Sequence, residues 1–134
     1  MNDNRSIIFP YVRLEIIGAV RELADLTYQR KHWIGGPAPQ TRFADVVHRL
    51  FDDTALNDAP ALCVGEFLIN EAELMALTKA MRALDVVFEA YGYDLTDIDY
   101  TFKPEWSAVI FAAQDAIALL DLNASLVIVR KNDV

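Results

Sequence analysis

Apolar residues recur every three or four positions along most of this chain, which is the spacing of one face of an α-helix. The first such pattern runs from Pro10 to about Tyr28, and proline suits the first turn of a helix because its missing N–H group is not needed there. The glycines and prolines of residues 35–39 end this pattern. A second helix is expected after Thr41, a good N-cap residue. Its apolar face consists of Phe43, Val46, Val47, Leu50 and Phe51.

The best helix start in the chain is at Asn70. This residue type favours the N-cap position, and Glu73 follows three residues later, as in a capping box. Gly92 is a suitable residue just beyond the end of the same helix. The segments on either side lack a clear pattern. We expect a loop at residues 53–60, a short helix or irregular segment at residues 61–69, and an acidic loop at residues 93–103.

The last helix opens at Pro104 and has apolar residues on nearly all sides, so we expect it to be buried on most of its surface. The tail Leu126–Val129 favours a strand that could pair with residues 6–9, although two short strands are marginal alone. A chain of 134 residues fits one domain, residues 1–134. The prediction is an all-α bundle of four or five helices, with or without a two-stranded ribbon joining its terminal segments.

Acidic residues are concentrated in the middle of the chain. Residues 52–121 contain 14 Asp and Glu residues against three basic ones, and the whole chain has a net charge of −8. Such a surface repels nucleic acid and anionic lipid and attracts basic protein surfaces. We therefore expect a basic protein as the partner, and no nucleic acid or membrane. The candidate contact residues are Asp94, Asp97, Asp99, Asp52, Asp53 and Asp58.

The remaining composition favours a cytoplasmic protein. The N-terminal residues do not have the pattern of a signal peptide, and the single cysteine, Cys63, has no second cysteine for an intramolecular disulfide. The most apolar stretch, residues 106–129, is interrupted by polar side chains, which favours a core helix over a membrane-spanning one. These side chains are Gln114, Asp115, Asp121 and Asn123.

Few side chains have the spacing of a chemical site. Asp45, His48 and Asp52 lie at positions i, i+3 and i+7 of one helix face, where they could bind a divalent metal or exchange protons. A solvated polar face is the favoured interpretation, because the chain offers only one other histidine, His32. Cys63 lies among apolar residues in the acidic part, as expected of a buried core cysteine. We expect no enzyme activity, no cofactor and no metal.

The segment from His32 to Gly36 contains Trp33 next to two glycines. An exposed tryptophan beside glycines can anchor a partner protein. The alternative, which we favour, is that Trp33 packs against the end of the first helix while the glycines turn the chain.

A set of short motifs extends from about Tyr11 to Leu120. It consists of residues 50–56 (Leu-Phe-Asp-Asp-Thr-Ala-Leu), Pro60, Gly65, Leu68, Glu71, Leu84, Asp85, Pro104, Trp106 and Val109. This set resembles a family of small all-helical bacterial proteins. The resemblance implies an all-α fold, and it implies no catalytic residue because that family has no assigned activity. In size and acidity the chain is also similar to immunity proteins that accompany polymorphic or contact-dependent toxins.

Three functional hypotheses follow. The first is an acidic protein-binding module, of the immunity type, that neutralises a basic toxin. The second is a small structural or regulatory protein that forms a homodimer through its tail strand or its last helix. The third is a metal-dependent enzyme or sensor that uses Asp45, His48 and Asp52.

Overall fold

The computed structural model describes residues 6–34 and 41–129. Within these residues the chain is mostly helical, so the predicted all-α class is confirmed. The elements, in order, are β1 (Ser6–Ile7), α1 (Pro10–Leu23), α2 (Leu26–His32), α3 (Arg42–Phe51), the 3₁₀ turn η1 (Pro60–Cys63), α4 (Glu71–Tyr91), α5 (Asp97–Tyr100), α6 (Trp106–Leu122), the 3₁₀ turn η2 (Ala124–Leu126) and β2 (Ile128–Val129).

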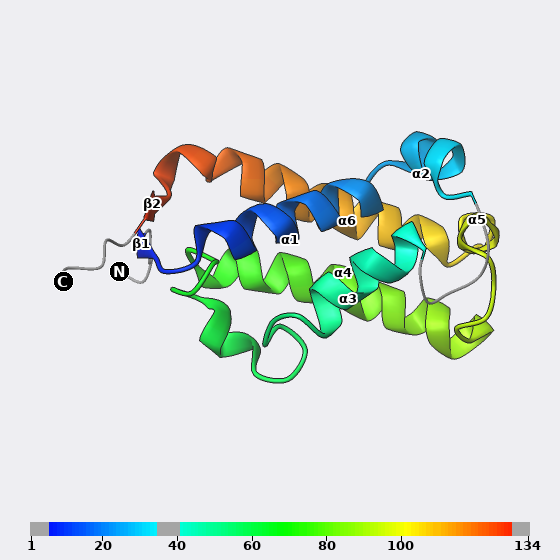
Figure 1. Ribbon diagram of the computed structural model, residues 1–134, viewed down its shortest axis with the longest axis horizontal. Coiled ribbons are helices and arrows are strands. Elements are labelled where there is room, and N and C mark those ends of the chain that lie inside the picture. The colour runs from blue at the N-terminus through cyan, green and yellow to red at the C-terminus, as the bar shows by residue number, and fades with distance from the viewer. Residues whose placement is uncertain (1–5, 35–40, 130–134) are drawn as a thin grey trace.

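Three long helices, α1, α4 and α6, lie side by side along the long axis of the molecule, and α3 lies beside α1, with which it packs (Figure 1). The packing between α4 and α6 is the most extensive, and α1 packs on both α6 and α3. Apolar side chains from all four helices meet in one core. Its members include Ile16, Val20, Leu23, Val46, Leu50, Leu77, Met81, Leu84, Val109, Ala113 and Ala116.

The helix start predicted at Pro10, the N-caps predicted at Thr41 and Asn70, and the helix end predicted at Gly92 are confirmed. The Thr41 hydroxyl accepts a hydrogen bond from the Ala44 N–H group at 3.1 Å, and the Asn70 side chain accepts one from the Glu73 N–H group at 3.0 Å. Each bond satisfies an N–H group that has no partner within its helix. Gly92 follows α4 with a φ of 74°, a conformation that glycine adopts without steric cost.

The prediction of one helix from Pro10 to about Tyr28 is wrong, because the chain breaks between α1 and α2. Asp25 ends the first helical pattern by acting as the N-cap of α2, and its carboxylate accepts a hydrogen bond from the Tyr28 N–H group at 2.9 Å. The Gln29 amide then donates to the carbonyl oxygens of Glu22 and Leu23 at 2.7 and 3.0 Å. Side chains therefore replace the backbone bonds lost at the break.

The predicted acidic loop at residues 93–103 contains the short helix α5, and the last helix begins at Trp106 rather than at Pro104. The Tyr100 hydroxyl holds α5 against the end of α4 by donating to the Gly92 carbonyl oxygen at 2.7 Å. These contacts depend on the end of another helix, so local sequence alone did not predict them.

The prediction that α6 is buried on most sides is wrong, because only one face of it packs in the core. Ala112, Ala113 and Ala116 allow close contact with the neighbouring helices, while Phe111 and Leu122 are 64% and 73% exposed. By length and composition, Trp106–Leu126 is the one candidate for a membrane span in the described chain. Burial of its small residues between α1 and α4 is also typical of the central helix of a bundle.

The two ends of the described chain meet at one end of the bundle (Figure 1). β1 and β2 pair in parallel, with Ser6 opposite Ile128 and Ile7 opposite Val129. The N–H groups of Ile8 and Phe9 donate to the Glu66 carbonyl oxygen at 3.1 and 2.8 Å. The ribbon expected between the terminal segments is therefore present, at two residues per strand.

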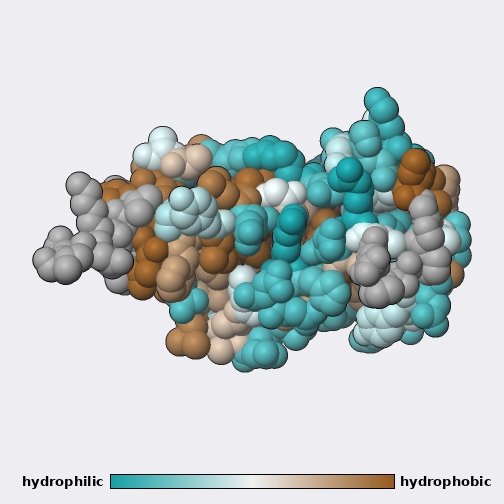
Figure 2. Space-filling model, viewed as in Figure 1, coloured by the Kyte–Doolittle hydropathy of each residue, from teal (hydrophilic) through white to brown (hydrophobic). Residues whose placement is uncertain are grey.

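Polar residues cover α3 and the loop that follows it, whereas apolar residues are frequent toward the β1–β2 end (Figure 2). This polar cover agrees with the sequence of α3, in which Phe43, Val46 and Leu50 are buried and Asp45, His48 and Asp52 point away from the core. α3 thus brings a hydrophilic surface to the middle of the molecule.

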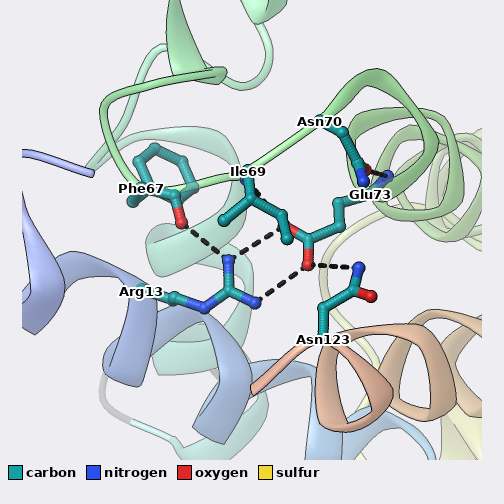
Figure 3. Close-up of polar contacts among 6 residues, drawn as sticks. All are labelled: Arg13, Phe67, Ile69, Asn70, Glu73 and Asn123. Atoms are coloured by element: carbon teal, nitrogen blue, oxygen red, sulfur yellow. Dashed lines mark hydrogen bonds and ion pairs between the residues drawn. The ribbon is translucent and has the colours of Figure 1, made fainter. Parts of the chain in front are cut away.

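A buried ion pair joins α1 to α4 (Figure 3). Arg13 donates two hydrogen bonds to the Glu73 carboxylate, both at 2.9 Å, and a third to the Phe67 carbonyl oxygen at 3.0 Å. The Ile69 N–H group and the Asn123 amide donate to the same carboxylate. Burial opposes ionisation of Glu73, but these hydrogen bonds and the Arg13 charge outweigh it and hold the pKa of Glu73 below its usual value.

Candidate functional site

A hollow of about 390 Å³ lies between α3, α4 and the segment that contains α5. It forms because α3 packs chiefly against α1, which leaves space on the side of α3 that faces α4. Its size lies in the range of about 300–1,000 Å³ that is usual for small-molecule sites. The residues that line it are Thr41, Phe43, Ala44, Val47, His48, Phe51, Asp52, Asn57, Asp85, Phe88, Tyr93, Leu95, Asp97 and Tyr100.

Aromatic rings form the apolar wall of the hollow. Phe43, near the start of α3, lies at the centre of a cluster in which its ring is stacked on Phe88 at 5.7 Å between centroids and meets Tyr100 edge-on at 5.3 Å. Tyr93 stacks on the other side of Phe88 at 4.8 Å. Contacts of this kind favour particular ring orientations.

Two tryptophans support this wall from the core. The Trp33 ring stacks on Phe43 at 4.9 Å and its indole donates to the Glu22 carboxylate at 3.2 Å. The Trp106 indole donates to the Gln29 side chain at 2.9 Å. Because Trp33 is buried, the expectation that it packs at the end of the first helical segment is confirmed. Gly35 and Gly36 lie outside the described residues.

The polar lining of the hollow is acidic. Asp52, Asp85 and Asp97 line it, and no Lys or Arg is among its described lining residues. Asp85 pairs at 2.8 Å with Arg82, which lies outside the lining and also donates to Asn57. Asp52 accepts from the His48 ring. Two of the three carboxylates therefore have a basic group of the chain beside them.

Asp97 differs from the other two carboxylates because it is buried, with 6% of its surface exposed. Its Oδ2 atom accepts a hydrogen bond from the Phe43 N–H group at 3.1 Å, which places the carboxylate at the N-terminus of α3. Within residues 6–34 and 41–129, no Lys, Arg or His forms an ion pair with it. Asp97 thus lies inside the hollow and is removed from the exposed loop surface on which the sequence had placed it.

The other predicted contact acids are exposed at the two ends of α3. Asp94 and Asp99 lie on either side of Asp97 in the sequence, and the Asp97 carboxylate accepts a hydrogen bond at the start of α3. The second group follows its end and consists of Asp52, Asp53 and Asp58. Residues 45–58 and 85–99, which both contribute lining residues to the hollow, contain nine acidic residues and one Arg between them. The structure therefore brings two distant acidic segments together at one hollow.

The field of these acids also acts on a tyrosine of the hollow. Burial, with a contribution from the charges of Asp94 and Asp97, raises the pKa of Tyr100 above its usual value. The Tyr100 hydroxyl therefore remains protonated near neutral pH and keeps its hydrogen bond to Gly92.

The side chains considered for metal or nucleophilic chemistry do not form such sites in the described chain. His48 pairs with Asp52 at 2.5 Å on an exposed helix face, and no group of three or more His, Cys, Asp or Glu side chains within residues 6–34 and 41–129 is placed to hold a metal ion. Cys63 is buried as predicted, and burial together with the Glu66 charge raises its pKa to about 11. Its thiol is therefore protonated at neutral pH.

The model of one protein family, a domain of unknown function named DUF7945, matches residues 7–125. The chain belongs to the DUF7945 family. The match includes every residue that lines the hollow, so the hollow is part of the DUF7945 domain itself. No curated protein and no solved structure matches the chain.

Proposed function

We propose that this DUF7945 protein is a binding module for a basic protein, and that the contact surface is the hollow together with the exposed acids at both ends of α3. The observation that carries this proposal is the lining of the hollow, which combines three carboxylates and five aromatic rings without a Lys or Arg among the described residues. Rigid aromatic side chains are typical anchors of protein interfaces.

The charge distribution supports the same assignment. Nine acidic residues lie in the two segments that contribute lining residues to the hollow, three of them in the lining itself, and their charge would attract a partner with a positive surface. Complementary charge mainly raises the rate of association and selects the partner, whereas the apolar wall supplies contact area. In its more specific form the proposal makes the protein an immunity protein and the partner a basic toxin, as the size and acidity of the chain suggest.

Reversing two exposed acids beside the hollow should slow association. We expect the variant Asp94→Lys/Asp99→Lys to bind its basic partner with an association rate about tenfold lower at low salt, and with a weaker dependence of that rate on salt. The partner is first isolated with the tagged chain, identified by mass spectrometry and purified. Rates are then measured by surface plasmon resonance at several salt concentrations.

A matched control has the same change in charge on elements that do not line the hollow. Glu15 and Asp115 are exposed on α1 and α6, so Glu15→Lys/Asp115→Lys changes the net charge equally. Association that slows equally in both variants would reduce the effect to overall charge and contradict a contact surface at the hollow. Association that is unchanged in both would contradict an electrostatic contact altogether.

Self-association is a second candidate, because large apolar side chains are exposed on two helices that pack together. Tyr11 and Leu14 of α1 are 81% and 65% exposed, and Phe111 and Leu122 of α6 are similarly open. Exposed apolar groups in such numbers can form an interface between copies. Size-exclusion chromatography with light scattering separates the candidates: a stable dimer that co-purifies with no basic protein supports the second.

A further inference from the structure

We infer that the hollow binds one organic cation, an ammonium or guanidinium group, with Asp97 as its counter-charge and the rings of Phe43, Phe88, Tyr93 and Tyr100 as its wall. This inference rests on the proposed function in that it names the group of the basic partner that enters the hollow. Its first observation is the burial of Asp97 without an ion-pair partner among the described residues.

A buried carboxylate is costly unless its charge is balanced. The Phe43 N–H group and the start of α3 supply part of the balance, because a helix N-terminus is equivalent to roughly half a positive charge. The second oxygen of Asp97, Oδ1, has no hydrogen bond within the described chain. No fully buried side-chain oxygen or nitrogen there lacks a partner, so Oδ1 retains some exposed surface, and Asp97 is one of the residues that line the hollow. A cation entering the hollow would complete the balance.

The aromatic rings provide the second, independent observation. In the described chain, a basic side chain lies over the face of a ring in four places: Arg30 over Phe102, Lys103 over Tyr91, Arg42 over Tyr28 and Arg82 over Phe51. Of these rings only that of Phe51 lines the hollow. The four wall rings named above have no such cation of their own among the residues described. Ring faces attract cations, and more strongly where water is excluded. The hollow therefore has rings that carry no cation of the described chain, next to a carboxylate that has no ion-pair partner there.

Arg82 does not fill this role. It lies outside the lining and is engaged with Asp85 at 2.8 Å and with Asn57 at 2.8 Å. These bonds hold it near Phe51, next to the end of α3, whereas Asp97 lies at the start of that helix. Arg82 therefore does not neutralise the Asp97 carboxylate, which can pair with a cationic ligand.

The test uses a small cation and a neutral molecule of the same shape. Choline and 3,3-dimethylbutan-1-ol differ in that the quaternary nitrogen of the first is a carbon atom in the second. In titrations of the purified chain followed by ¹H–¹⁵N NMR, we expect choline to bind saturably, with shifts at the amides of Phe43, Tyr93 and Asp97. The neutral molecule should bind about tenfold more weakly or worse. Equal affinity for both, or shifts centred elsewhere, would overturn the inference.

A variant tests the counter-charge itself. Asp97→Asn keeps an oxygen that can accept the Phe43 N–H group, so it removes the charge while preserving the cap of α3. Choline affinity should fall about tenfold, whereas Asp115→Asn, an exposed acid on α6 outside the lining of the hollow, should leave it unchanged. Unchanged choline affinity in a folded Asp97→Asn protein would overturn the role of Asp97. If that variant unfolds, the comparison of the two ligands on the wild-type chain decides.

The outcomes also separate this inference from the proposed function. A basic protein partner that binds at the hollow while choline does not would overturn the cation site alone. Selective choline binding by a chain that has no basic protein partner would overturn the proposed function and leave the site in place.

Discussion

Replacing Glu73 with Gln should lower the free energy of unfolding by about 3–5 kcal/mol, the cost typical of removing one partner of a buried ion pair. The substitution leaves the guanidinium of Arg13, which is almost fully buried, without its counter-charge. It also gives the Asn123 amide and the Ile69 N–H group a weaker acceptor. Urea denaturation followed by far-ultraviolet circular dichroism measures the change.

The chain contains a matched control for this variant, because a second Arg–carboxylate pair has similar geometry on the surface. Arg21 donates to Asp121 at 2.9 and 3.3 Å, and both side chains are at least half exposed. Water screens this pair, so Asp121→Asn should cost less than about 1 kcal/mol. Equal losses in the two variants would show that burial does not determine the strength of the Arg13–Glu73 pair.

Lowering the pH should remove the stabilisation that the Arg13–Glu73 ion pair contributes. The pKa of Glu73 in the folded protein is held below its ordinary value of 4.5, so the carboxylate contributes its full stabilisation above that pH and loses it as the pH falls through the folded value. The difference in unfolding free energy between wild type and Glu73→Gln should therefore be largest at neutral pH and shrink below about pH 4.5. Urea titrations from pH 7 to pH 3 measure it, and a difference that grows toward acid would contradict this assignment.

Replacing Phe43 with Ala should lower the free energy of unfolding by a similar amount, about 3–5 kcal/mol, as is typical of truncating a large buried ring. Phe43 is 3% exposed and contacts the rings of Trp33, Phe88, Tyr100 and Trp106. Its loss leaves a gap at the centre of this cluster and opens the hollow toward the core. Thermal and urea denaturation of the purified variant measure the loss.

Phe111→Ala serves as the control for the removal of a phenyl ring. Phe111 is 64% exposed on α6, so its truncation should change the unfolding free energy by no more than about 0.5 kcal/mol. A loss comparable to that of Phe43→Ala would indicate that the outer face of α6 is covered in solution, as in a dimer. A small loss in both variants would contradict the central position of Phe43 in the core.

Local sequence signals were sufficient for the starts of α3 and α4. The caps at Thr41 and Asn70 depend on a side chain and a backbone group three residues apart, so their chemistry is contained in a short segment. The break at Asp25 was missed because apolar residues continue through it with helical spacing, and because Gln29 supplies the replacement hydrogen bonds only after the chain has turned. Periodicity reports which residues face the core and is insensitive to such a break.

The candidate site could be predicted only in part. The excess of acid was visible in the composition, but the hollow depends on how α3 is placed relative to α4. Asp97 and Phe43, which are joined by a hydrogen bond, lie 54 positions apart in the sequence. The spacing of apolar residues correctly predicted that Phe43 faces the core, but it could not indicate that Phe43 also lines a cavity. Long-range contacts therefore decide which of the many acids matter.

The parallel pairing of β1 with β2 has a practical consequence for orientation. It brings both ends of the described chain to one end of the molecule, opposite to α5 and the start of α3 (Figure 1). A chain immobilised on a sensor chip through either end would present the hollow outward, accessible to dissolved molecules. A fluorescent protein fused at either of these ends would likewise lie far from a ligand bound in the hollow.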